Sequence, residues 1–315
     1  MKKVILTGGT GFIGRWLIKE LIENDVEVIA FVRKLVEDPI IEGTSVEYFN
    51  VFSSDKVSQI VFDSEEMISL DAEAVKDVDA FYHLAWGGVS SELKNDWEIQ
   101  LHNIDLSVKM LDWAHSVNIP KFIAMGTVAE YSFCEGTMDV DAKQTPNDMY
   151  GATKTATHYL LETRARLIGM PFIWCVIPST YGEGRRDNNI ITYTIKTLLK
   201  GDKPSYGYLT QMWDFLYVAE VARALRFIGD KGLTKKTYAI GSGVYKPLRE
   251  YIEIIRDSID PKLELGIGDI PSYSDKVFSS CVSISELTKD TGFEPQVSFE
   301  EGIKRTIPYF KTLAE

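Results

Sequence analysis

The sequence predicts an α/β fold, a doubly wound parallel sheet covered by helices on both faces. Two observations predict it. A short apolar segment at 4–7 runs directly into a glycine-rich turn and then a helix. Strand and helix patterns then alternate as far as residue 178, which is the order that a parallel sheet with crossover helices requires. The chain has 315 residues, 45% of them hydrophobic and 25% charged, so a large core is expected.

The elements of this first part follow one another closely. Apolar strand segments are expected at 4–7, 26–32, 45–52, 79–86, 121–127 and 172–178. Helical spacing is expected over 15–25, 96–118 and 148–168. The last helix has Asn147 as its expected N-cap, Gly169 at its C-terminal end and Pro171 beyond.

Beyond residue 178 the alternation weakens. A strand or turn enters a helix over 213–229, and 237–243 is a further short strand. We therefore expect a dinucleotide-binding domain of residues 1–178 that is completed by 209–243. Residues 179–208 and 244–315 are expected to form a smaller C-terminal substrate-binding lobe over the carboxyl edge of the sheet, where such folds bind ligands.

Composition restricts the partners. A formal net charge of −12 argues against binding to nucleic acid or to an anionic membrane. The apolar run after Met1 is too short for a signal peptide, and no window has the length of a membrane-spanning helix. The three cysteines and four histidines lack disulfide-framework or metal-ligand spacing, so we expect a reduced, cytoplasmic protein without a metal site.

The glycine-rich segment is the first motif that carries chemistry. Gly9, Gly11 and Gly14 fit G-x-G-x-x-G between a strand and a helix, and Gly8 precedes them. This pattern allows a tight turn, a close approach of the backbone to a pyrophosphate, and a helix N-terminus facing negative charge. The expected cofactor-binding residues here are Gly8, Thr10, Gly11, Phe12, Ile13 and Gly14.

A second motif is Tyr150-Gly-Ala-Thr-Lys154 inside the predicted helix 148–168. Positions i and i+4 share a helix face, so the phenol and the ammonium can lie close together. A nearby cation favours the phenolate, and we expect the pKa of Tyr150 to fall below its usual value near ~10, which suits a general acid or base. Taken alone, such a pair is usually a solvated helix face.

Several motifs occur in order and together resemble one family. They are TGGTGFIG at 7–14, HLA at 83–85, YGATK at 150–154, STYG at 179–182 and DFLYVAEVARAL at 214–225. The chain resembles, over essentially its whole length, an extended short-chain dehydrogenase/reductase of the NAD(P)-dependent epimerase/dehydratase family. The resemblance implies a Rossmann-type fold, a nucleotide-diphosphate sugar as substrate, and a homodimer formed through helices 96–118 and 148–168.

The same resemblance assigns roles to residues. Thr127, Tyr150 and Lys154 match the catalytic triad: Tyr150 exchanges a proton with the sugar, Lys154 lowers the tyrosine pKa and holds the nicotinamide ribose, and Thr127 hydrogen-bonds the substrate oxygen. Leu84 and Ala85 are expected to run beside the cofactor.

On the substrate side, the resemblance points to Trp86, Thr127, Asn189 and Trp213. Asn189 equally fits turn chemistry, and Trp86 equally fits a core position. Trp213 stands where many relatives have an arginine matched to the diphosphate. Arg185 and Arg186 could replace that contact, or belong to a solvated loop.

Arg33 and Lys34 follow the second predicted strand, 19 residues after Gly14 for Arg33, where a ribose-binding acid is usually expected. An arginine pairs with a 2′-phosphate, which a carboxylate would repel. The sequence therefore favours NADP(H), with NAD(H) as the alternative, and the other interpretation is that both residues begin an exposed loop.

Dehydratases of this family place an Asp-Glu pair after the catalytic Ser/Thr, whereas this chain has Val128 and Ala129. Glu130 follows, and an extended chain would point it to the opposite side. We therefore expect an NADPH-dependent reductase of a 4-keto-6-deoxy nucleotide sugar with Tyr150 as proton donor. The alternatives are a nucleotide-sugar 4-epimerase and a non-catalytic dinucleotide-binding sensor.

Overall fold

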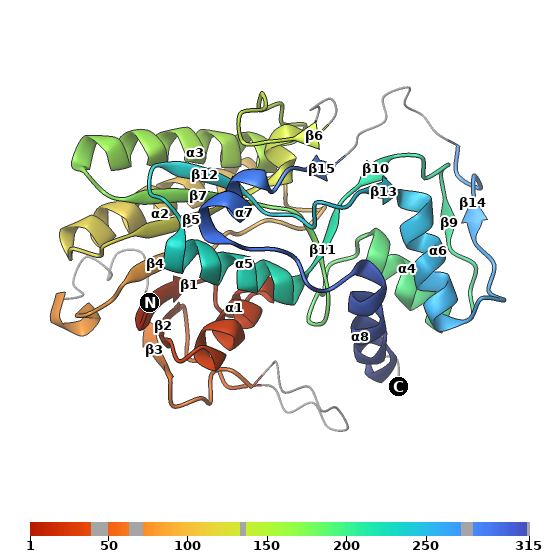
Figure 1. The fold of residues 1–315 in the computed structure, drawn as a ribbon, viewed down its shortest axis with the longest axis horizontal. Coiled ribbons are helices and arrows are strands. Elements are labelled where there is room, and N and C mark those ends of the chain that lie inside the picture. Colours follow the sequence, from red (N-terminus) through yellow and green to blue (C-terminus); the bar gives the residue numbers. More distant parts are fainter. Residues whose placement is uncertain (39–49, 63–71, 133–136, 272–279, 314–315) are drawn as a thin grey trace.

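The computed structural model describes residues 1–38, 50–62, 72–132, 137–271 and 280–313. Within them, one seven-stranded parallel sheet has the order β12-β7-β5-β4-β1-β2-β3 (Figure 1). Its strands are β1 (Lys3–Thr7), β2 (Glu27–Val32), β3 (Val57–Val61), β4 (Ala80–His83), β5 (Phe122–Thr127), β7 (Phe172–Ile177) and β12 (Lys236–Ala239). This order confirms the predicted doubly wound, Rossmann-type architecture.

Helices cover both faces of this sheet, as Figure 1 shows. On one face α1 (Phe12–Glu23) packs on α5 (Val218–Lys231), and on the other α2 (Trp97–Ser116) packs on α3 (Met149–Ile168). Two separate clusters of buried apolar side chains fill the spaces between the sheet and the helices. Strands buried on both faces explain the apolar segments without alternation in the sequence.

The remaining elements lie mainly beyond the carboxyl edge of the sheet (Figure 1). The helices are α4 (Ile190–Leu199), α6 (Leu248–Ile259), α7 (Ser285–Thr291) and α8 (Phe299–Thr312), and the short helical turns are η3 (Ala72–Val75) and η4 (Val128–Tyr131). The short strands are β6 (Thr137–Met138), β8 (Ser179–Tyr181), β9 (Ser205–Tyr206), β10 (Met212–Trp213), β11 (Phe215–Tyr217), β13 (Lys246–Pro247), β14 (Gly266–Ile267) and β15 (Cys281–Val282). One apolar cluster runs from β1 to α8, and the division into two domains stays a prediction.

Two local expectations differ from the structure. Asp148, not Asn147, caps α3, because its carboxylate accepts a hydrogen bond from the Gly151 N–H at 2.8 Å. The expected strand at 45–52 lies mostly outside the described residues, and its last three residues, 50–52, are not in a strand. The sheet continues instead with β3, which pairs with β2 in parallel. Gly169 ends α3 in the left-handed conformation at φ 78°, as predicted.

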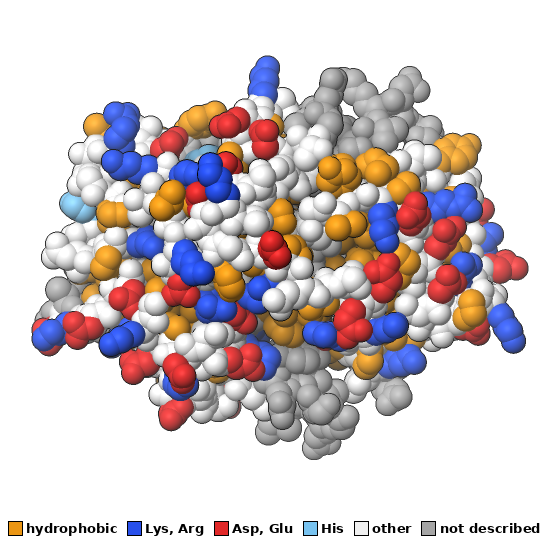
Figure 2. Space-filling model, viewed as in Figure 1, with side chains coloured by type: hydrophobic (Ala, Val, Ile, Leu, Met, Phe, Trp, Pro, Cys, Tyr) orange, Lys and Arg blue, Asp and Glu red, His pale blue; other side chains and the backbone are white. Residues whose placement is uncertain are grey.

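Strand order reverses between β1 and β4, and their carboxyl ends bound the crevice in which doubly wound folds bind ligands. Both strands end near the glycine-rich turn that precedes α1. Figure 2 shows basic and acidic side chains interspersed on one face of the molecule. Among the described residues, no helix is both long and apolar enough to cross a membrane.

Candidate active site

The glycine-rich turn is shaped by two close contacts. Gly8 has φ 75°, and a Cβ there would come within 2.7 Å of the Leu84 carbonyl carbon and of the Ala85 nitrogen. A Cβ on Gly14 would lie 2.1 Å from the Gly8 oxygen. Only glycine fits at either position, because the neighbouring atoms belong to the backbone.

The turn leaves the N-terminus of α1 open. The Gly11 N–H donates to the Gly8 oxygen at 3.0 Å, and no side chain of the described residues caps the helix. No acidic residue stands in the first turn of α1, so its positive end is available to an anion. The exposed Thr10 and the half-buried Phe12 and Ile13 border this position. The residues fit a dinucleotide pyrophosphate, as the sequence predicts.

A buried histidine holds the neighbouring segment in place. His83 Nδ1 lies 2.9 Å from the Thr7 hydroxyl, and Nε2 lies 3.0 Å from the Ser107 hydroxyl. Burial, and to a lesser degree the charge of Lys154, lowers the pKa of His83 to about 3, so the imidazole is neutral at pH 7. The Leu84 N–H donates to the Thr7 oxygen at 3.2 Å. These bonds fix Leu84 and Ala85 beside the glycine-rich turn.

The structure brings the three predicted catalytic residues to one place. Thr127 ends β5, while Tyr150 and Lys154 lie in the first half of α3. Gly151 lets α3 approach closely, because a Cβ there would lie 2.5 Å from the Ala129 oxygen. Lys154 is buried, and its ammonium donates to the Met125 oxygen at 2.6 Å.

Trp86 belongs to this group. Its ring centroid lies 3.6 Å from Lys154 Nζ, a cation–π contact, and 6.3 Å from the Tyr150 ring at an interplanar angle of 77°. The indole N–H donates to Gln100 Oε1 at 3.1 Å. Trp86 is half-buried, and this environment favours the predicted site position over the alternative of a core residue.

The prediction that Lys154 lowers the pKa of Tyr150 is wrong for the chain without ligands. Burial raises the pKa of Tyr150 to about 12; the Thr127 side chain acts in the opposite direction, and the charge of Glu130 adds to the rise. Burial also lowers the pKa of Lys154 to about 7, which weakens its action as a cation. The phenol is therefore protonated at neutral pH, as a proton donor requires.

The chain after Thr127 is not extended, contrary to expectation. Residues 128–131 form the 3₁₀ helix η4, and Thr127 and Glu130 form a capping box. The Thr127 N–H donates to Glu130 Oε1 at 2.7 Å, and Glu130 is fully buried. The carboxylate is therefore turned back towards the end of β5.

Two predicted substrate residues have structural contacts. Asn189 caps α4, its Oδ1 accepting from the Ile191 N–H at 2.9 Å and the Thr192 N–H at 3.1 Å, so turn chemistry explains its oxygen. Trp213 lies in β10 with its ring 6.2 Å from that of Phe215. Its indole N–H is buried and has no hydrogen-bond partner among the described residues. It can therefore donate a hydrogen bond to a ligand.

The two arginines after β8 differ. Arg185 makes a bidentate ion pair with Asp187, with N–O distances of 2.7 and 2.8 Å, and its guanidinium carbon lies 5.5 Å from the centroid of the Phe12 ring. Arg185 is therefore held against the glycine-rich turn. Arg186 is exposed, as the solvated-loop alternative requires.

At the end of β2, Arg33 and Lys34 are both exposed. The nearby carboxylate of Asp38 is held elsewhere. It pairs with Arg15 at 3.1 Å and accepts a hydrogen bond from the Ser53 N–H at 2.8 Å. The position that usually carries the ribose-binding acid thus presents a solvent-accessible guanidinium.

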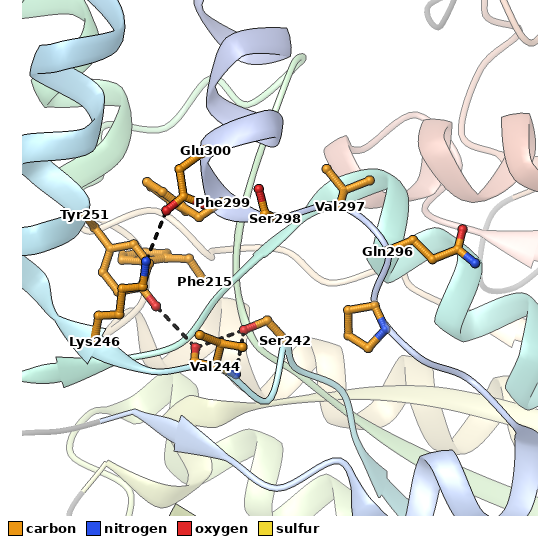
Figure 3. Close-up of a pocket in the computed structure, with 11 residues that line it drawn as sticks. Phe215, Ser242, Val244, Lys246, Tyr251, Gln296, Val297, Ser298, Phe299 and Glu300 are labelled. Carbon is orange, nitrogen blue, oxygen red and sulfur yellow. Dashed lines mark hydrogen bonds and ion pairs between the residues drawn. The ribbon is translucent and has the colours of Figure 1, made fainter.

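A cavity of about 300 Å³ lies outside this site (Figure 3). Its aromatic residues are Phe215, Tyr251 and Phe299, and Lys246 reaches Glu300 at 3.1 Å along one side. None of the predicted site residues lines it. Its charged groups are paired with each other, so we assign it no part in the chemistry.

The turn, the crevice and the Thr127, Tyr150 and Lys154 group are the arrangement of a dinucleotide-binding short-chain dehydrogenase/reductase. The chain belongs to the NAD dependent epimerase/dehydratase family, whose model matches residues 4–241. This confirms the resemblance drawn from the sequence motifs.

Similar proteins carry several different names. The dTDP-glucose 4,6-dehydratase of Salmonella typhimurium is 22% identical, with 98% of this chain and 92% of that protein covered. The CDP-abequose synthase of Salmonella muenchen is 24% identical, with 97% of each chain covered. The solved structure of UDP-glucuronic acid 4-epimerase from Bacillus cereus, in complex with UDP-glucuronic acid and NAD, has a TM-score of 0.82, 21% identity and 99% coverage of both chains.

Proposed function

We propose that the chain is an NADPH-dependent reductase of a 4-keto-6-deoxy nucleotide sugar. The observation that carries this proposal is the solvent-accessible guanidinium of Arg33 at the end of β2, which favours a 2′-phosphate. The half-buried phenol of Tyr150, beside Thr127 and Lys154, is the proton donor. The glycine-rich turn, Arg33 and Lys154 would hold a reduced nicotinamide dinucleotide, which would supply the hydride for the keto carbon. Tyr150 donates its proton to the developing alkoxide, so the carbonyl becomes a secondary alcohol.

The surrounding residues position the reactants. The Thr127 hydroxyl holds the substrate oxygen beside Tyr150, and the Lys154 ammonium stabilises the phenolate that remains after proton transfer. Trp86 borders the sugar, while Asn189 and Trp213 supply donors on the substrate side, namely an amide and the unpartnered indole N–H. These assignments rest on the geometry of the chain and on its family.

The chain lacks the acidic residues that the family's dehydratases carry directly after the catalytic Ser/Thr. Val128 and Ala129 stand where the family's dehydratases have an acidic pair, and they form the first turn of η4. The following acid, Glu130, faces the backbone of Thr127. The chain is 22% identical to a dTDP-glucose 4,6-dehydratase, but without these carboxylates we do not propose dehydration.

A nucleotide-sugar 4-epimerase is the second candidate. Similarity to a UDP-glucuronic acid 4-epimerase with bound NAD favours it, and the triad serves both reactions. A non-catalytic sensor is a weaker candidate, because Thr127, Tyr150 and Lys154 are all present and gathered at one place.

We also propose that the chain forms a homodimer through α2 and α3. These helices pack side by side and carry large apolar side chains that remain exposed, namely Trp97, Leu101, Tyr159, Leu160 and Leu167. Exposed apolar side chains gathered on neighbouring helices are typical of an interface.

The reductase assignment is tested by incubating the protein with NADPH and a dTDP- or CDP-4-keto-6-deoxyhexose. We expect stoichiometric loss of the reduced-nicotinamide absorbance and formation of one alcohol per NADPH. Interconversion of UDP- or GDP-hexoses without net NADPH consumption would instead select the epimerase.

Arg33 tests the cofactor preference. Replacing it by alanine removes a charge-assisted contact to the 2′-phosphate, and such contacts are worth about 1.5–3 kcal/mol, or roughly ten- to a hundredfold in affinity. We expect NADPH binding to weaken by about that factor and NADH binding to change less than about threefold. Arg164→Ala, an exposed arginine paired with Asp112 between α3 and α2, is the matched control. Equal losses for both dinucleotides would contradict the 2′-phosphate role.

Tyr150→Phe tests the proton donor. We expect kcat to fall by at least about a hundredfold, because the general acid is lost, with NADPH affinity nearly unchanged. Tyr208→Phe changes an exposed phenol outside the triad and outside α2 and α3, and should leave both quantities as they are. Survival of turnover in Tyr150→Phe would show that another group donates the proton.

A further inference from the structure

A column of polar side chains runs along α3 and begins with the catalytic residues Tyr150 and Lys154. Tyr150, Lys154 and His158 follow one another at i, i+4 and i+8 along α3, so they share one helix face. Glu130 of η4 meets this face, with Oε2 3.8 Å from His158 Nδ1. Gln144 links them, because its Nε2 lies 2.9 Å from Glu130 Oε2 and 3.2 Å from His158 Nδ1.

Glu130 and Lys154 are anchored on either side of Gly126. The Lys154 ammonium donates to the Met125 oxygen at 2.6 Å, and Glu130 Oε1 accepts from the Thr127 N–H at 2.7 Å. The Glu130 carboxylate packs tightly on Gly126, since a Cβ there would lie 2.5 Å from Glu130 Oε1. The end of β5 therefore holds an ammonium and a carboxylate bonded to backbone groups two residues apart, in a setting from which water is largely excluded.

Both groups are shielded from solvent. Lys154 is 5% exposed and Glu130 is 0% exposed. A buried charge without a compensating charge is strongly unfavourable. His158 does not supply that compensation, because burial lowers its pKa to about 4 and leaves it neutral at pH 7.

Glu130 and Lys154 each oppose the pKa shift that burial causes in the other. Burial raises the pKa of Glu130 to about 7, the Thr127 N–H opposes that rise, and so does the charge of Lys154. Burial lowers the pKa of Lys154 to about 7, and the charge of Glu130 opposes that fall. Other titratable groups that face this pair are Tyr150 and His158 of α3, Tyr131 of η4 and His83 of β4.

We propose that Glu130 is a positioning residue whose buried carboxylate stabilises the charged form of Lys154, so that without it the ammonium loses its proton at a lower pH. This inference rests on the proposed function, because the charged Lys154 acts there on the nicotinamide ribose and on the Tyr150 phenolate. Glu130 is fully buried and acts through Lys154 and the backbone of Thr127.

The test is the pH dependence of NADPH binding by the full chain, with NADH as a second probe. Glu130→Gln retains an oxygen that accepts from the Thr127 N–H but removes the charge. Because the pKa of Lys154 falls further without Glu130, its charge is lost at lower pH. We expect the alkaline loss of affinity to move down by about one pH unit, and the affinity at pH 5.5 to stay within about twofold.

Two controls separate charge from structure. Glu130→Asp keeps the carboxylate and should return the midpoint to within about half a pH unit of the wild-type value. Glu220→Gln removes another buried carboxylate, on α5 and paired with Arg223 at 2.7 Å, and should leave the midpoint unchanged. Thermal unfolding of each variant establishes that it is folded at the pH values used.

Affinity lowered by the same factor at every pH in Glu130→Gln, or an unmoved midpoint, would overturn the proposal. The assay needs no sugar, so a shifted midpoint in a protein that reduces no keto sugar supports the role of Glu130 while rejecting the reductase. Absence of binding to either dinucleotide overturns both proposals.

Discussion

The burial of the Lys154 ammonium at the carboxyl end of β5 is the constraint on which the site depends. The amine lies against the Trp86 ring at 3.6 Å and donates to the Met125 oxygen at 2.6 Å. Removing an ammonium from water costs several kcal/mol, and a carbonyl oxygen, an aromatic face and the Glu130 carboxylate together offset part of that cost. The positions of α3, η4 and the segment after β4 follow from this arrangement.

The backbone permits this arrangement through a few close approaches. Gly151 brings α3 onto η4, Gly126 makes room for Glu130, and Gly8 brings the turn before α1 onto Leu84. A side chain at any of these positions would separate elements that now hold the dinucleotide crevice and the catalytic group side by side. Local glycines therefore set the distance between the two halves of the proposed chemistry.

Much of the fold and of the candidate site could be predicted, because the features involved are patterns of residues close together in the sequence. The glycine-rich turn, the strands around it and the Tyr150, Lys154 spacing are short-range features, and the structure places them as expected. The raised pKa of Tyr150 could not be predicted from spacing, because its largest cause is burial, which depends on tertiary packing. Asn189 was ambiguous, since an asparagine before a helix serves a cap or a ligand equally well.

Glu130 was missed as a partner of Lys154 for a similar reason. The T-x-x-E spacing of Thr127 and Glu130 is a capping-box signal and could have revealed the helical turn of η4. The contacts of His158 and Gln144 with that carboxylate depend on tertiary packing, so the local sequence does not predict them.

Reductase and epimerase differ in where the hydride ends, and this is the most direct test of the central claim. The measurement is mass spectrometry of the sugar product formed from a 4-keto-6-deoxy nucleotide sugar and NADPH deuterated at the transferable position of C4. A reductase predicts one deuterium bound to carbon in each product sugar and one oxidised dinucleotide per turnover. Sugar product without deuterium, with the label retained on the dinucleotide, would contradict the account.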